Sequence, residues 1–334
     1  VKGRVFAEGF WIRSFETIDV PLYPVTSNGT VYELMLRDFQ GIESLITVNN
    51  LGITKDGNCD PVLESVPMPG SPELNHSGDS FERVMSDSSC ANVDAGLIFL
   101  DVPASDLPTE STAWADGRSE NTWIRPQFEA PAIDGLSFDR SSTSTNAGTL
   151  TANMSNVGGR ARALVEIDAD GNGSFGDPAD VSKFVDVSGE TFKFQWDGKD
   201  AAGNATDIRD TVNFQVNVEG VSPIHFVRED IERSTGGIEV NVIRGAETGN
   251  MPLYWDDTPF KDSSAQRWSK TDPLSNTDAP SAGGVHGWAN DDPTANANDG
   301  VTGSWGDYRY IHDWAVAKIG SVEPASATLD PLDP

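Results

Sequence analysis

Apolar residues recur at every second position along much of this chain, and this period constrains the fold more than any other feature. The stretches 3–15 (GRVFAEGFWIRSF), 31–39 (VYELMLRDF) and 43–53 (ESLITVNNLGI) alternate or run apolar, and Gly, Pro or Asn clusters bound them. Side chains in a β-strand alternate between two faces, so a period of two indicates strands. No segment keeps a 3.6-residue apolar period over three turns. The sequence therefore predicts an all-β protein with several domains and few, short helices.

Residues 133–219 form a separate group of short strand candidates. These candidates are 148–156, 160–168, 180–187, 190–198 and 210–218. Short strands at regular spacing, with turn residues between them, are typical of an immunoglobulin-like (Ig-like) β-sandwich. The Cys and Trp spacing of antibody domains is missing from this stretch. We therefore expect an Ig-like β-sandwich without the antibody disulfide.

The pattern divides the chain into three regions. Residues 1–130 are predicted to form a β-rich domain with a disulfide, and residues 131–220 the Ig-like sandwich with a calcium loop. Residues 221–334 form a β-rich region with many Trp and Asp residues. The two outer regions each look incomplete as a domain. A second arrangement is therefore left open, in which 1–130 and 221–334 form one domain and 131–220 is inserted into it.

The composition is strongly acidic, with 52 acidic and 23 basic residues and a formal net charge of −29. Nucleic acid is excluded as a partner, because binding the phosphate backbone requires Lys and Arg to displace counterions. The same charge disfavours an anionic membrane surface, and no run of 18 apolar residues is present to insert into a bilayer. Salt that screens the repulsion, or bound divalent cations, would make such a charge tolerable.

Cys59 and Cys90 are the two cysteines of the chain, and both lie in polar surroundings, KDGNCDP and SDSSCANVD. Free thiols are usually buried, so these surroundings favour a disulfide that closes a loop of about thirty residues. Such a bridge places the protein outside the cytoplasm. The alternative is a pair of unrelated buried thiols. The chain begins without Met or a visible signal peptide, and we interpret it as a piece of a longer exported protein.

Three stretches resemble parts of bacterial surface proteins. YELMLRDFQGIESLITVNNLGITKDGNC (32–59) is similar to the N-terminal region of large surface proteins of actinobacteria and other bacteria. FQWDGKDAAGN (194–204) resembles the Ig-like repeats of bacterial cell-surface and hook-capping proteins. The stretch from GGVHGW to SWGDYRYIHDW (283–314) resembles the closing part of such surface regions. The resemblance implies an exported, non-catalytic, adhesin-type region at the cell surface. Its partner would be a host or matrix protein, or a glycan, on another surface.

The stretch EIDADGNGSFGDPAD places oxygen-bearing side chains at every second residue, at Asp168, Asp170 and Asn172. Calcium binds about six to eight hard oxygens, and a loop with this spacing wraps them around one point. The three residues match positions 1, 3 and 5 of an EF-hand loop, and Gly173 supplies the turn at position 6. The backbone carbonyl of Ser174 would occupy position 7.

An EF-hand is nevertheless excluded, because Ala179 holds position 12, where a bidentate Glu is required, and strands flank the loop. A shorter hairpin loop closed by Asp177 or Asp180 is predicted instead. The predicted calcium ligands are Asp168, Asp170, Asn172, Ser174, Asp177 and Asp180. The alternative is an acidic turn held by Asx-type hydrogen bonds. We expect the calcium ion to stabilise the fold.

Trp residues gather near the C-terminal end together with Asp and Asn, in YWDDTPF, GVHGWANDDP and SWGDYRY. Aromatic rings can stack on sugars while carboxylates and carboxamides take the hydroxyl groups. The predicted ligand-binding residues are Trp255, Asp256, Asp257, Trp288, Asn290 and Trp305. In one alternative, the Trp rings fill a core that is short of aliphatic residues. In another, Asp256, Asp257, Asp291 and Asp292 bind a second calcium ion.

Sequence motifs of enzymes are missing. The four His residues show no paired spacing, and the chain contains neither a His-Glu-x-x-His zinc motif nor a Gly-x-Ser-x-Gly nucleophile motif. Carboxylate pairs such as Glu229 with Glu232, or Asp256 with Glu239, could in principle serve a glycosidase. A chain with 52 acidic residues offers such pairs by chance.

The sequence therefore predicts no enzymatic activity, and we expect neighbouring carboxylates to satisfy His286 and His312. The expected function is that of a calcium-stabilised, ligand-binding module of an exported bacterial surface adhesin. A purely structural stalk or spacer is the first alternative. A polysaccharide-active enzyme is the second.

Overall fold

The computed structural model describes residues 2–332 with the exception of 56, 70–79, 86–87, 91–92, 94–95, 112–119, 122–130, 158–159, 188, 232, 258–275, 289–305, 307–308 and 322–323. The secondary-structure elements of the described residues are all β-strands, which confirms the predicted all-β class. Within these residues, no helix has the length and apolar character needed to span a membrane.

The chain divides into two compact units, and neither is one continuous segment. Unit 1 comprises residues 1–127 and 223–317, and unit 2 comprises residues 128–222 and 318–334. Residues 318–334 are part of the predicted region 221–334. In the structure, their strand β22 (Ala325–Leu329) pairs with β16 (Val212–Glu229) in the sandwich of unit 2. This strand is so short that the alternation of its apolar residues does not indicate which strand it pairs with.

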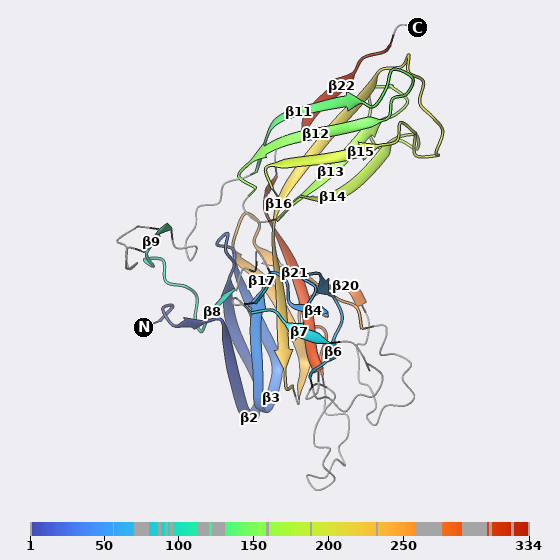
Figure 1. The fold of residues 1–334 in the computed structure, drawn as a ribbon. Coiled ribbons are helices and arrows are strands. Elements are labelled where there is room, and N and C mark those ends of the chain that lie inside the picture. Colours follow the sequence, from blue (N-terminus) through green and yellow to red (C-terminus); the bar gives the residue numbers. More distant parts are fainter. Residues whose placement is uncertain are drawn as a thin grey trace, which may run out of the picture. The chain divides into compact units, whose positions relative to one another are not determined.

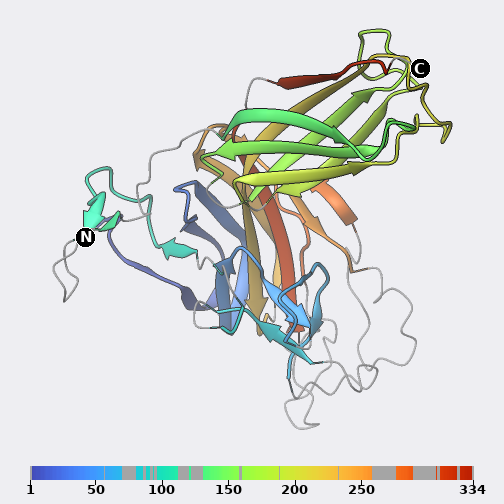
Figure 2. The same ribbon diagram turned by 45° about the horizontal axis from the view of Figure 1, so that its top comes forward.

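Unit 2 is a sandwich of two antiparallel sheets, seen as two layers in Figure 1 and Figure 2. One sheet has the order β11 (Ala132–Arg140), β12 (Gly148–Ser155), β15 (Thr191–Trp196). The other sheet has the order β14 (Val181–Val187), β13 (Arg160–Asp168), β16 (Val212–Glu229), β22 (Ala325–Leu329). Lettered along the chain, the strands form an A-B-E sheet packed on a C′-C-F-G sheet. This is an arrangement of the Ig-like sandwiches.

Alternating side chains from both sheets fill the space between them. Leu150 and Met154 of β12 are buried there, as are the rings of Trp196 and Phe214. The Phe214 ring stacks on Phe138, with the ring centroids 4.5 Å apart. Burying each large apolar side chain stabilises the fold by about 1.5–3 kcal/mol, so the inward-facing positions of the period-two pattern stabilise the sandwich.

The long strand β3 (Val31–Asn49) organises unit 1. β2 (Gly9–Val25) pairs along one edge of β3, and the two strands lie side by side in Figure 1. The end of β16 and then β17 (Ser234–Arg244) pair along the other edge, one after the other. β3 therefore has backbone partners on both sides over most of its length.

β3 is one strand of 19 residues where the sequence predicts two, 31–39 and 43–53. Gly41 suggests a turn in the sequence, but in the structure it pairs with Ser14 of β2. Pairing with β2 at Gly41, with β17 before it and β16 after it on the other edge, carries the strand through a residue that weakens strands. Near this point the backbone departs from regular strand geometry at Asp38, where φ is 51°.

Shorter strands complete unit 1, and the last of them, β21 (Arg309–Ser321), has its final residues from 318 onward in unit 2. They are β1 (Phe6–Ala7), β4 (Ile53–Lys55), β5 (Pro61–Val62), β6 (Val66–Pro67), β7 (Phe81–Arg83), β8 (Leu97–Phe99), β9 (Glu110–Ser111), β10 (Glu120–Asn121), β18 (Gly249–Asn250), β19 (Pro252–Trp255), β20 (Asn276–Pro280) and β21 (Arg309–Ser321). The core of this unit draws buried side chains from β2, β3, β16, β17, β19 and β21. Its large buried rings are those of Tyr32, Phe39, Phe226 and Trp255.

Cys59 and Cys90 form the predicted disulfide, with their Cα atoms 5.5 Å apart. The bridge spans 31 residues of sequence. The closed loop contains β5, β6 and β7, and β5 and β7 both pair with β4. The disulfide thus fastens a set of strands too short to be stable alone.

We expect the double variant Cys59→Ser/Cys90→Ser to lose about 3–4 kcal/mol of unfolding free energy, because the unfolded chain regains the entropy of an open loop. Denaturant unfolding monitored by Trp fluorescence measures this loss. Adding a thiol reductant should destabilise the wild-type chain and leave the double variant unchanged. Equal stability of the two oxidised proteins would show that the bridge makes no contribution.

Candidate functional site

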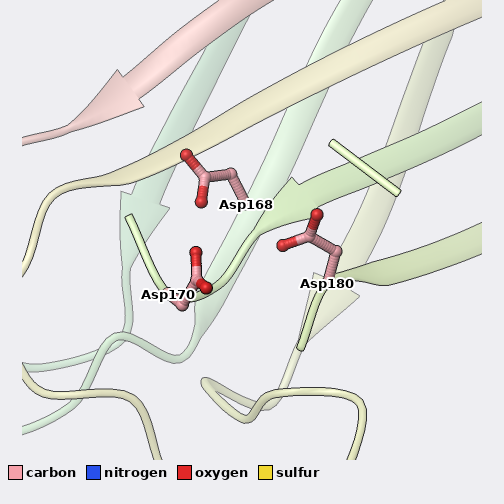
Figure 3. A group of neighbouring side chains, drawn as sticks. All are labelled: Asp168, Asp170 and Asp180. Carbon is pink, nitrogen blue, oxygen red and sulfur yellow. The ribbon is translucent and has the colours of Figure 1, made fainter. Parts of the chain in front are cut away.

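Three carboxylates converge at one end of the sandwich in unit 2. One oxygen each from Asp168, Asp170 and Asp180 lies within 4.8 Å of the others, so the group could hold a metal ion. Figure 3 shows the three side chains pointing toward one another. Asp168 and Asp180 are buried and Asp170 is exposed, so the group has both a sheltered side and a side open to solvent.

Strand pairing brings the two ends of this loop together. β13 ends at Asp168, and its antiparallel partner β14 begins one residue after Asp180. Between them the backbone turns at Gly171, where φ is 70°. A Cβ atom at this position would lie 2.6 Å from the carbonyl oxygen of Thr211, so glycine is required by both the backbone angle and the close approach.

Hydrogen-bond donors fix the orientation of the carboxylates. Asp168 Oδ2 accepts hydrogen bonds from Gly173 N (2.9 Å) and Asn213 Nδ2 (2.8 Å). Asp180 Oδ2 accepts one from Asp177 N (3.1 Å). In the described part of the chain, no Lys or Arg forms an ion pair with any of the three carboxylates. Like charges this close repel, and a divalent cation would compensate them.

The other three predicted ligands lie around this group. Asn172 Nδ2 donates to Asp170 Oδ2 (3.0 Å) and to Asp177 Oδ2 (2.6 Å). Ser174 N donates to Asn172 Oδ1 (2.7 Å), and its side chain is exposed. The buried acid that closes the group is Asp180, at position 13 of the loop. The hydrogen bonds of Asn172 also match the alternative interpretation, an acidic turn held by Asx-type hydrogen bonds. Side chains of the loop therefore help to hold its backbone conformation.

The predicted ligand-binding residues lie elsewhere, in unit 1. Trp255 and Trp288 are only 1% and 2% exposed, and both belong to the interior. Rings this deeply buried offer no face for a sugar, and their placement matches the interpretation that Trp fills a core short of aliphatic residues. Asn290 and Trp305 lie outside the described residues.

The two neighbouring acids differ in their surroundings. Asp256 is half-buried, and its N–H donates to the Leu63 carbonyl (2.9 Å). Asp257 is fully buried and accepts hydrogen bonds from Ser65 N (2.7 Å) and from His286. Asp257 is therefore occupied by protein donors. The other acids of the predicted second calcium site, at 291 and 292, lie outside the described residues.

A buried ionic network that sequence analysis did not identify surrounds His286. The Nε2 atom of His286 lies 2.6 Å from Asp257 Oδ2, and its Nδ1 atom is hydrogen-bonded to Asp313. Arg228 Nη2 donates to the other oxygen of Asp313 (2.9 Å). The imidazole ring stacks on Trp255, with centroids 4.6 Å apart. Because both ring nitrogens face carboxylates, both must carry a proton, and His286 is an imidazolium.

The pKa shifts of the network follow from this geometry. Burial lowers the pKa of His286, but Asp313 and Asp257 outweigh burial and raise it to about 9. Burial raises the pKa of Asp313, and the charges of His286 and Arg228 bring it below its usual value. The pKa of Arg228 is lowered by burial, against the opposing charge of Asp313. Each charge is tolerated in the interior because an opposite charge contacts it.

A second pair of imidazoles lies on β16 and β21. His225 Nδ1 and His312 Nε2 are 2.9 Å apart, so one nitrogen donates and the other accepts. Burial lowers the pKa of His312 to about 4, which keeps it neutral at ordinary pH. Neighbouring carboxylates thus contact His286 as expected, whereas the Nε2 atom of His312 contacts His225. Gly52 packs against this pair, and any side chain there would overlap the His312 ring.

Two of the three described carboxylates of the suggested glycosidase pairs, Glu229 and Glu239, form ion pairs with arginines. Glu229 pairs with Arg83 (2.8 Å), and Glu239 pairs with Arg37 (2.6 Å). Glu232 lies outside the described residues. The His286 network has no exposed side chain. These groups are placed to stabilise unit 1, and the convergent carboxylates of unit 2 are the arrangement best suited to binding a ligand.

Comparisons of the chain with protein-family models, curated protein sequences and solved structures found no match.

We expect Asp170→Asn to change stability in opposite directions with and without metal. In chelator, removing one of three repelling charges should leave the melting temperature unchanged or raise it slightly. In calcium, it should abolish most of the stabilisation by the ion, which is about 2.7 kcal/mol at a concentration a hundred times Kd. Calorimetric melting in calcium and in chelator measures both effects.

Asp139→Asn is the matched control for this experiment, because Asp139 is an exposed acid on β11 of the same sandwich. It should melt like the wild-type chain in both buffers. A wild-type melting temperature that is the same in calcium and chelator would contradict the assignment of a metal site.

We expect the stability contribution of His286 to be lost at alkaline pH. Its folded-state pKa is raised to about 9, so the contribution is fully present below the unfolded pKa near 6.5 and falls as pH rises through 9. Urea unfolding from pH 6 to pH 10 measures this fall. His286→Gln should be less stable than wild type at pH 6, and the difference should shrink toward pH 10. A difference that stays constant over this range would contradict a charged His286.

Proposed function

We propose that this chain is a calcium-stabilised, ligand-binding module of an exported bacterial surface adhesin. The observation that carries the calcium part is the convergence of Asp168, Asp170 and Asp180, which form no ion pair with a cationic side chain in the described part of the chain. Oxygen ligands suit hard cations, and the group contains no His or Cys that would favour a transition metal. Calcium is preferred over magnesium because it tolerates an irregular, mixed set of carboxylate, carbonyl and water ligands.

The disulfide and the charge support an extracellular location. Disulfides such as Cys59–Cys90 persist in oxidising compartments. A net charge of −29 is most easily tolerated where salt screens it and calcium neutralises part of it. A β-sandwich fastened by a metal loop, in a chain that also has a disulfide, suits a protein that must stay folded outside the cell.

Adhesion is favoured over a passive spacer by the resemblance of three stretches to bacterial surface proteins. The ligand would be a protein or a glycan on another surface. Asn290 and Trp305 remain predicted contacts for it, whereas Trp255 and Trp288 support the fold. A spacer would share the calcium loop and the disulfide, so only a binding measurement separates the two functions.

We expect beads coated with this chain to bind a defined ligand on a glycan array or a panel of matrix proteins, in calcium and more weakly in chelator. Trp305→Ala should reduce the signal several-fold. Trp11→Ala is the matched control, because Trp11 is an exposed ring (58%) on β2, outside the predicted site. Calcium-dependent melting with no ligand on either panel would point to the spacer, and release of reducing sugar ends from a polysaccharide would point to an enzyme.

A further inference from the structure

A groove of about 750 Å³ opens in unit 2 between β14 and β15. These are the outer strands of the two sheets: among the described strands, β14 pairs with β13 alone and β15 with β12 alone. The sandwich is therefore not closed by a further strand on this side. The free edge of β14 presents backbone N–H and C=O groups that another strand could pair with.

The groove is lined by apolar and polar side chains, and the apolar ones come from the facing sides of β14 and β15. Val181 and Val185 of β14 lie opposite Ile167 and Ala163 of β13, so their side chains point toward the core side of the sheet. Phe194 and Trp196 face them from β15. Phe194 and both valines are only partly buried, which leaves apolar surface open to an incoming chain.

Lys183 stands in the middle of this apolar wall. It lies opposite the buried Val165, so its side chain projects from the same face of β14 as Val181 and Val185. Within the described part of the chain, Lys183 forms no ion pair. At the end of the groove near the metal loop, Lys199 is 3.9 Å from Asp197. Among the described lining residues, Lys183 is thus the ammonium without an ion pair, and the carboxylates of Asp180, Asp197 and Asp200 also line the groove.

We propose that this groove binds an extended peptide segment with one acidic residue between apolar ones, which adds to β14 as a strand and places its carboxylate against Lys183. Side chains on one face of a strand recur at every second residue, so the segment would carry the pattern apolar-x-acidic-x-apolar opposite 181–185. An inward-pointing Lys on an edge strand repels most incoming strands. Here Lys183 also selects among incoming strands. A strand with an acidic residue opposite Lys183 compensates the charge, and its apolar residues on either side pack against the apolar side chains of the groove.

This inference names a partner class for the proposed adhesive function and rests on that function. Its test is separate from the melting and array experiments above. The full chain, labelled with ¹⁵N and held in calcium, is titrated with the blocked peptide Thr-Val-Thr-Glu-Thr-Val-Thr and followed by NMR. A second titration uses the same peptide with Lys in place of Glu.

We expect amide shifts confined to residues 181–187 and 194–201, and affinity roughly tenfold higher for the Glu peptide than for the Lys peptide. Lys183→Glu should reverse the preference, and Lys183→Gln should abolish it. Lys193→Glu is the matched control, because Lys193 lies opposite Thr151 on the outer face of β15 and should keep the wild-type preference.

Three results would overturn the inference: no binding of either peptide, equal affinity for both, or shifts that map away from the groove. A glycan that shifts the same amides when neither peptide does so would also overturn it. Calcium-dependent melting and array binding that persist without peptide binding would leave the proposed function standing and reject the groove alone.

Discussion

The backbone hydrogen bonding of β16 is the constraint on which both units depend. Its first residues pair with β13 on one edge and β22 on the other, inside unit 2. Its last residues, from His225 to Glu229, pair with β3 of unit 1. A buried strand must satisfy its N–H and C=O groups on both edges. One strand of 18 residues therefore requires partners from segments that are more than two hundred residues apart in the sequence.

The protein deals with buried charge in two different ways. In unit 1 the charges of Arg228, His286, Asp257 and Asp313 compensate one another through direct contacts. In unit 2 three carboxylates meet without a cationic partner among the described residues. A charge network that is complete is a structural element, since removing one member leaves another uncompensated. A set of like charges that is incomplete points to a cation from solution.

The two tryptophans Trp255 and Trp288 show that local composition alone does not identify a binding surface. Trp255 and Trp288 lie among Asp and Asn in the sequence, which resembles the chemistry of a sugar site. In the structure Trp255 stacks on His286 and Trp288 lies within 5.4 Å of the same ring, measured between centroids. Of the polar residues beside these rings in the sequence, Asp257 contacts the buried His286. Partly exposed apolar side chains, Val181, Val185 and Phe194, lie instead at the open side of the sandwich, where period two alone gave no sign of a groove.

The sequence by itself determined the strand class, the Ig-like sandwich of the middle region, the disulfide and the acidic loop. Each of these rests on local chemistry: alternation along one strand, polar residues around Cys59 and Cys90, and oxygens at every second position from Asp168. Tertiary structure alone decided which distant segments meet. His286 is 29 residues from Asp257 and 27 from Asp313, with no motif that links them. The pairing of β22 with β16, the closing role of Asp180 and the exposure of Lys183 likewise depend on strand register, which long-range packing selects and local sequence does not encode.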